Sequence, residues 1–255
     1  MAPMPALITD PPFLAIGTIA VVLLGLSKGG FAGVGALGTP LLALVIGPVE
    51  AAAIILPILI VQDLVGVWAF RRNWDGKILA LMLPASLAGI ALAYWSAASL
   101  PQAGMQILLG LISVIFAARN LWLQRGGRIP AATDPPRWLG MLMGFASGVS
   151  SQIAHAGQLP FQIYVLPKRL DRDVLVGTTA IFFAAVNWIK VPAYFALGQF
   201  SHAHLMASLA FAPIALISTL AGVWLVRRVN TDRFYGLIYW LMLLVGTRLI
   251  WEGLS

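Results

Sequence analysis

The sequence predicts an all-α polytopic membrane protein made of two inverted repeats, each a broken, re-entrant helical hairpin followed by three transmembrane helices. Of the 255 residues, 60% are hydrophobic and only 10% are charged, and the mean hydropathy is +0.91. A soluble domain carries about a quarter of its residues as charged side chains. The long apolar runs therefore indicate membrane spans, and two of these runs are interrupted by glycine and polar residues.

The first repeat is expected over residues 1–125 and opens with a broken hairpin at residues 13–46. Its apolar run is interrupted at residues 27–35, where several glycines surround Lys28. Continuous apolar runs of about 20 residues, the length that crosses a bilayer, follow this hairpin. They predict spans at residues 51–70, 78–98 and 103–123.

A cytoplasmic linker at residues 126–137 leads to the second repeat, residues 138–255. This repeat opens with an interrupted run at residues 138–166, which as one helix would be ~44 Å long. Two full crossings and a turn would need ~60 Å, so we expect short or broken helices that enter and return to one face. The spans that follow are predicted at residues 174–197, 205–226 and 234–251.

Basic residues set the expected orientation. Apart from Lys28, Lys190 and Arg248, every lysine and arginine lies in or beside one of four loops between apolar runs. Positively charged loops stay in the cytoplasm, so both termini are expected on the outer face of the inner (plasma) membrane. Because the net charge of +7 is distributed over these loops, we expect a lipid bilayer and no nucleic acid as partner.

Short matches between the two halves support an internal repeat. A hairpin plus three spans inverts the second half relative to the first. Inverted repeats with paired interrupted helices are typical of secondary transporters, whose substrate site lies where the breaks meet. The matched segments are 33–40 with 153–160, 62–64 with 186–188, Phe70 with Tyr194, and 73–74 with 199–200.

Two lysines lie in apolar segments where a cation is expensive unless it faces a cavity, a partner or an anionic ligand. Lys190 belongs to an expected span, and Lys28 belongs to the glycine-rich interruption. Backbone amides freed by glycine there would form an anion-binding cradle with Lys28. The alternative is close packing of helices through small residues. The glycines of the proposed cradle are Gly29, Gly30, Gly33 and Gly35.

The second interruption places Ser151, His155 and Gln158 among apolar residues. Polar side chains at this depth must line a cavity or satisfy one another, so we expect these three to contact the substrate. His155 could also move a proton, because its charge changes near neutral pH. The alternative is a neutral histidine that caps exposed backbone carbonyls.

Helical spacing places Asn187, Lys190 and Tyr194 on one stripe of an expected span. Asp63 is the only acid within an expected span, at the position that matches Asn187. An Asp63–Lys190 ion pair would stabilise both charges. Asp63 could also break and re-form that pair during transport. The residues expected to couple or gate are Gln62, Asp63 and His155.

Two other classes of function stay open at this point. An ion channel or a cation or metal permease would use Asp63 and His155 as ligands. An intramembrane hydrolase would use Ser151 and His155, which lie four residues apart, as a catalytic dyad. We expect no cofactor and no metal site, and the absence of cysteine excludes disulfides and thiolate ligands.

Ordered motifs along nearly the whole chain point to a known family. They are residues 28–33 (KGGFAG), 39–44 (TPLLAL), 56–63 (LPILIVQD), 71–75 (RRNWD), 155–157 (HAG), 162–167 (QIYVLP), 177–180 (GTTA) and 182–190 (FFAAVNWIK). With these motifs the chain resembles the sulfite exporter TauE/SafE (TSUP) membrane transporter family. The resemblance implies a secondary transporter, most often an exporter, of small anions such as sulfite, sulfoacetate or other sulfonates. The coupling ion, a proton or sodium, and a homodimeric state stay open.

Overall fold

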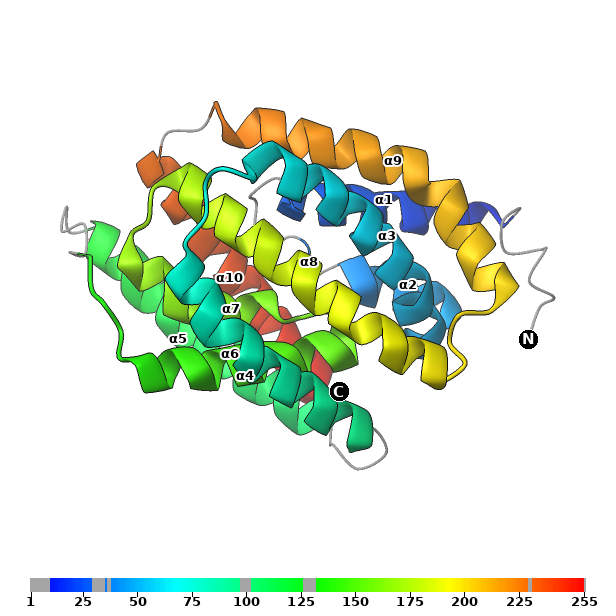
Figure 1. Cartoon of the computed structure of the whole chain (residues 1–255), viewed down its shortest axis with the longest axis horizontal. Coiled ribbons are helices and arrows are strands. Elements are labelled where there is room, and N and C mark those ends of the chain that lie inside the picture. Colours follow the sequence, from blue (N-terminus) through cyan, green and yellow to red (C-terminus); the bar gives the residue numbers. More distant parts are fainter. Residues whose placement is uncertain are drawn as a thin grey trace. The chain divides into compact units, whose positions relative to one another are not determined.

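The computed structural model describes residues 10–28, 35, 38–96, 102–125, 132–228 and 231–254. Within them, every regular element is a helix (Figure 1), which confirms the all-α prediction. The helices are α1 (Pro11–Lys28), α2 (Gly38–Ile46), α3 (Pro48–Phe70), α4 (Gly76–Trp95), α5 (Gln102–Arg125), α6 (Arg137–Ala154), α7 (Gln158–Val165), the short 3-10 helix η3 (Leu166–Lys168), α8 (Arg172–Ala196), α9 (His202–Val226) and α10 (Thr231–Leu254).

Six of the described helices are long and apolar enough to cross a membrane, namely α1, α3, α4, α8, α9 and α10. The chain is therefore a multi-pass membrane protein. The stretch expected to span at residues 103–123 lies in α5, a helix of 24 residues that is not among these six. Helix α1, the first arm of the broken hairpin expected at residues 13–46, has 18 residues and reaches ~27 Å, close to the thickness of the hydrocarbon core.

Helices α6 and α7 form a broken helical hairpin, with the break in the region where the sequence predicts one. Helix α7 has only 8 residues, or ~12 Å, which is too short to cross a bilayer. After α7 the chain returns to the end at which α6 begins. A hydrogen bond shows this return, since the Thr133 N–H, just before α6, donates to the Pro167 carbonyl, just after α7, at 3.0 Å. The corresponding helices of the first half, α1 and α2, show the same combination of lengths, 18 and 9 residues.

The chain divides into two compact units, and both take helices from both halves of the sequence. The first unit, residues 1–72 with 179–228, contains α1, α2, α3, most of α8, and α9. The second unit, residues 73–178 with 229–255, contains α4 to α7, the start of α8, and α10. The units therefore do not coincide with the two repeats expected along the sequence.

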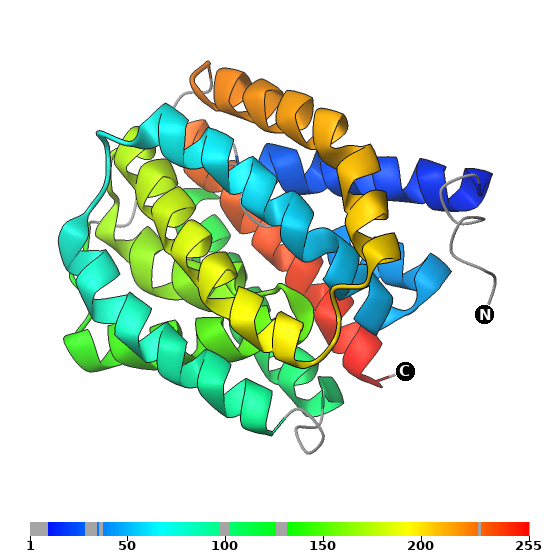
Figure 2. The same ribbon diagram turned by 45° about the vertical axis from the view of Figure 1, so that its right-hand side comes forward.

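In the first unit, α1 and α9 lie side by side and run in the same direction (Figure 1, Figure 2). The Phe13 and Phe211 rings meet edge to face at 5.6 Å. Further along both helices, Gly25 lies so close to Ser218 that a Cβ would overlap the serine side chain. This contact supports close packing through small residues as the role of Gly25.

In the second unit, α4 and α6 repeat this arrangement. Gly144 faces the Met82 backbone, and Gly148 faces the Ser86 carbonyl one turn further along both helices. The two helices therefore also run in the same direction. In the order of elements, α6 corresponds to α1 and α4 corresponds to α9. The first helix of each half thus lies beside the fourth helix of the other half.

Corresponding helices also meet directly, and these pairs are antiparallel. In the first unit, α3 lies against α8 with Asp63 beside Asn187, and with Gly66 beside Ala180. In the second unit, Gly110 of α5 lies against Gly246 of α10, while Ile107 lies against Gly253. A two-fold axis in the membrane plane makes corresponding helices antiparallel where they cross, so all four pairings are consistent with an inverted repeat.

Candidate functional site

The central contact of the first unit is a buried ion pair between α1 and α3. Lys28 Nζ lies 2.5 Å from Asp63 Oδ1, and the two side chains are 8% and 2% exposed. Lys28 is the last residue of α1, where the free carbonyls of a helix C-terminus favour a cation. Its ammonium also lies 5.6 Å from the centre of the Phe183 ring on α8.

Asn187 completes the surroundings of the carboxylate. Its Nδ2 donates to Asp63 Oδ2 at 2.7 Å, so both carboxylate oxygens have partners. The sequence left open an ion pair between Asp63 and Lys190, and in the structure the bond to Asp63 Oδ1 comes from Lys28. The sequence pattern suggested Lys190 because it lies near Asn187 on α8. The approach of the α1 C-terminus to α3 is a tertiary contact that spacing within one helix does not reveal.

Lys190 lies one turn after Asn187 and is completely buried. Its charge is repelled by Lys28 and attracted by Asp63, so it belongs to the same electrostatic group. We call Lys28, Asp63, Asn187 and Lys190 the charged cluster. With all groups ionised, its two cations and one carboxylate carry a net charge of +1. A buried positive excess favours an anion, since charges in an apolar interior require compensation.

Two other predicted residues hold the helices around the charged cluster. Gln62 is completely buried, and its Nε2 donates to the Val21 carbonyl of α1 at 3.1 Å. Gln62 therefore joins α3 to the helix that carries Lys28. Tyr194 lies two turns beyond Asn187, where it packs with Ala52 and Leu56 of α3 and its ring lies 6.0 Å from that of Phe200.

The glycine-rich interruption is only partly described. Gly29, Gly30 and Gly33 lie outside the described residues, whereas Gly35 is buried. Lys28 stands at the C-terminus of α1, and the N-terminus that would attract an anion belongs to α2, which begins at Gly38. Thr39, in the first turn of α2, is 6% exposed, and its Oγ1 has no hydrogen-bond partner among the described residues.

The α6–α7 break belongs to the second unit. Helix α6 ends at His155, whose backbone is left-handed with φ of 55° and whose N–H donates to the Ser151 carbonyl at 3.2 Å. Ser147 Oγ donates to the Gly157 carbonyl at 2.7 Å, which closes the turn. Ser151 and Gln158 are buried beside it. The break thus gathers neutral polar groups, whereas the first unit gathers charges.

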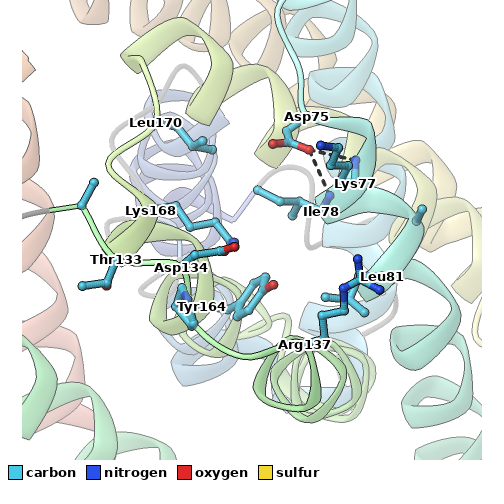
Figure 3. Close-up of a pocket in the computed structure, with 13 residues that line it drawn as sticks. Asp75, Lys77, Ile78, Leu81, Thr133, Asp134, Arg137, Tyr164, Lys168 and Leu170 are labelled. Atoms are coloured by element: carbon cyan, nitrogen blue, oxygen red, sulfur yellow. Dashed lines mark hydrogen bonds and ion pairs between the residues drawn. The ribbon is translucent and has the colours of Figure 1, made fainter.

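A cavity of about 760 Å³ opens where α4, α6 and η3 meet in the second unit (Figure 3). Three basic residues from three helices line it, namely Lys77 of α4, Arg137 of α6 and Lys168 of η3. In the first unit, Arg227 Nη2 similarly donates to the Ala69 carbonyl at 3.2 Å, at the helix end beside Arg71. Basic loops therefore gather at one end of each unit, as the orientation argument expects.

The comparison with protein families agrees with this geometry. The family model described as sulfite exporter TauE/SafE matches residues 16–249. The chain belongs to this family. TauE/SafE proteins are membrane transporters and not enzymes, which removes the hydrolase alternative. No curated protein and no solved structure matches the chain.

Sequence reasoning missed two features of these sites. It did not place Phe183 over Lys28, although Phe183 belongs to the same run as Lys190. It also used Lys77, Arg137 and Lys168 only to orient the chain, and so missed the cavity that they line. Asp134, an acid within a basic loop and three residues before Arg137, was the available signal.

Proposed function

We propose that the protein is a secondary transporter that exports small sulfur-containing anions, such as sulfite, sulfoacetate or other sulfonates, across the inner membrane by alternating access. The observation that carries this proposal is the charged cluster, in which a second buried lysine, Lys190, belongs to the same electrostatic group as the buried Lys28–Asp63 ion pair. A sulfonate offers three acceptor oxygens and accepts well from ammonium and amide donors. Family membership supports a sulfur anion within this class.

Within the charged cluster, Lys190 is the proposed primary contact of the anion. Lys28 is held by Asp63 before the anion arrives. If Asp63 takes up a proton, its attraction for Lys28 falls and the charged cluster carries a charge of +2. That state would bind an anion more tightly, so protonation of Asp63 would be linked to binding of the anion. Sodium remains the other candidate coupling ion. Gln62 is proposed to hold α3 against α1 while the charge of Asp63 changes.

The α6–α7 break is proposed to supply hydrogen bonds to the anion, and its His155 is also a proposed coupling residue. Ser151, His155 and Gln158 have polar groups that suit an oxyanion after it loses its water shell. Gly29, Gly30, Gly33 and Gly35 are proposed as backbone donors, and Tyr194 as a further contact from α8. These roles rest on residue chemistry and on the family, since a small anion needs several donors to replace hydration.

A cation or metal permease agrees less well with the surroundings of Asp63. Both of its carboxylate oxygens already bond to nitrogen donors, Lys28 and Asn187. Lys190 adds a second buried cation to the same group. Positive potential at that place repels a metal ion, so the charged cluster supports an anion as substrate.

Transport into proteoliposomes tests the proposal. Sulfite and sulfoacetate flux should saturate, while taurine, which also carries an ammonium group, should move more slowly. Lys190→Met should lower the flux at least about tenfold, because an ammonium bond to an oxyanion contributes about 1.5–3 kcal/mol. Asp63→Asn should remove the stimulation of flux by a pH gradient if the proton is the coupling ion.

Arg248→Gln is the matched control, because Arg248 is also a cation of a membrane helix but pairs with Glu252 at 2.8 Å on α10. Its flux should equal that of the unmodified protein. Equal flux for Lys190→Met and Lys28→Met would refute the proposed role of the charged cluster. Reconstitution efficiency, measured by the protein-to-lipid ratio, separates a transport defect from poor insertion.

A further inference from the structure

The cavity of the second unit has the features of a binding site that neither the proposed transport function nor the family membership assigns. Its volume of about 760 Å³ lies within the range of pockets that hold organic ligands. A sulfite ion would fill only a small part of it. The lining combines apolar side chains with basic ones, and the apolar part is Ile78, Leu81 and Leu170.

Three cations of this cavity attract one exposed carboxylate, that of Asp134. Lys168 pairs with Asp134, and Arg137 and Lys77 also attract the Asp134 carboxylate (Figure 3). The Asp134 side chain is 87% exposed, whereas that of Lys168 is 15% exposed. The acid thus reaches in from outside to a cation that is largely enclosed. Exposed ion pairs are weak, so another oxyanion can displace such a carboxylate.

The other acid of the lining is already engaged. Asp75 caps the N-terminus of α4 by accepting from the Lys77 N–H at 2.8 Å and the Ile78 N–H at 3.1 Å. Lys168 is meanwhile held in place by Tyr164, since its ammonium lies 4.7 Å from the centre of that ring. The cavity therefore has basic side chains at one end, and the Asp134 carboxylate occupies the position beside them where another anion could bind.

We propose that this cavity binds an organic oxyanion, a sulfonate or phosphate group carried on an apolar body. The oxyanion takes the place of the Asp134 carboxylate on Lys168 and Arg137, and the apolar body lies against Ile78, Leu81 and Leu170. Two sources offer this chemistry, a soluble organic anion and the headgroup of an anionic lipid. The site is separate from the charged cluster and does not depend on what that cluster transports.

The test measures binding directly, with the full chain in phosphatidylcholine nanodiscs and calorimetric titration of hexanesulfonate and methanesulfonate. Hexanesulfonate should bind more tightly, because its chain covers the apolar wall, and affinity should fall as salt rises. Lys168→Met and Arg137→Gln should each weaken binding at least tenfold. Asp134→Asn should tighten it about threefold or more, because it removes the competing carboxylate while Lys168 stays charged.

One variant outside the cavity keeps this test independent of the proposed transport function. Arg248→Gln should bind hexanesulfonate as the unmodified protein does, because Arg248 pairs with Glu252 and lies in neither proposed site. If Lys190→Met abolishes the signal and Lys168→Met does not, hexanesulfonate binds at the charged cluster and the proposal is wrong. It is also wrong if Asp134→Asn binds more weakly than the unmodified protein. Transport of sulfite by these variants is a separate measurement and does not decide the matter.

Nanodiscs with phosphatidylglycerol distinguish the two sources. If this lipid raises the apparent dissociation constant of hexanesulfonate, and does so for the unmodified protein but not for Lys168→Met, the natural occupant is an anionic lipid headgroup. If it has no such effect while hexanesulfonate still binds, the occupant is a soluble organic anion. Both results support the oxyanion site, whereas no binding of either sulfonate overturns it.

Discussion

The two halves of the chain share an arrangement of helices but not its charges. Matching residues 62–64 with 186–188 makes Asp63 correspond to Asn187, and Gly66 correspond to Lys190. Matching residues 33–40 with 153–160 makes Lys28 correspond to Gly148. Each ionisable residue of the charged cluster therefore corresponds to an uncharged residue in the other half of the sequence. The arrangement of helices is therefore common to both halves, whereas the ion pair that joins α1 to α3 is not.

The sequence match pairs Asp63 with Asn187, and these two residues also touch. Such a contact is consistent with an inverted repeat in which corresponding residues meet. Two identical residues here would be two carboxylates in repulsion or two amides without charge. One carboxylate and one amide give a bonded pair that still holds Lys28. The difference between the two residues therefore allows a buried charge in this pair without a like-charge contact.

Removing the carboxylate is the largest expected effect. Asp63→Leu leaves Lys28 as a buried cation without its acid, which should cost about 3–5 kcal/mol of unfolding free energy. The double variant Lys28→Met/Asp63→Leu should recover most of that loss, because no unpaired charge remains. Thermal unfolding in detergent measures both. Equal midpoints for the single and the double variant would mean that the ion pair is not formed.

Substitution of Gly148 should have the next largest effect on stability. A Cβ there would overlap the Ser86 backbone of α4, which cannot move aside as a side chain can. Gly148→Ala should therefore destabilise the protein by about 3 kcal/mol. Gly66→Ala is the matched control, because the nearest atom to its Cβ would be the Ala180 Cβ at 3.5 Å, an ordinary contact. If the two variants unfold at the same temperature, the close α4–α6 approach is wrong.

Loss of the Asn187 amide should lower the unfolding free energy less than loss of the Asp63 carboxylate. Asn187→Leu removes one hydrogen bond to a charged acceptor, and Asp63 keeps its bond to Lys28. The expected loss is about 1.5 kcal/mol, at the low end for such bonds. The double variant Asp63→Leu/Asn187→Leu should then cost less than the sum of the two single changes. Additive losses would show that the two side chains do not interact.

The sequence predicted the helices well, and it predicted the charged cluster in part. Apolar length and breaks suffice for helices, because a bilayer imposes a fixed span on the chain. The two lysines were recognisable because charge inside an apolar run is expensive. Their partner was not, since Lys28 meets Asp63 across 35 positions of sequence. The cavity was not predicted either, because Lys77, Arg137 and Lys168 lie far apart in the sequence and meet only in the folded chain.

The smallest expected effect lies outside the membrane helices, at Asp134 and Lys168. The Lys168 ammonium holds the pKa of Asp134 below its usual 3.8. Partial burial alone would lower the pKa of Lys168, but Asp134 and Tyr164 together outweigh it and raise the pKa above 10.5. The depressed acid contributes stability above pH 3.8, which is lost as the pH falls through its lower folded value. The raised lysine contributes below pH 10.5, and that part is lost as the pH rises through its higher folded value.

The difference in unfolding temperature between the unmodified protein and Asp134→Asn should therefore be small and constant from about pH 5 to 9, and should shrink in acid and in high salt. Asp63→Leu should behave differently, because its partner Lys28 is buried and salt screens buried pairs much less than exposed ones. Unfolding scans of both variants at two salt concentrations compare the two regions directly. If Asp134→Asn proves as destabilising and as insensitive to salt as Asp63→Leu, then Asp134 is a fixed part of the fold. A carboxylate fixed in that way could not yield its place on Lys168 to a ligand.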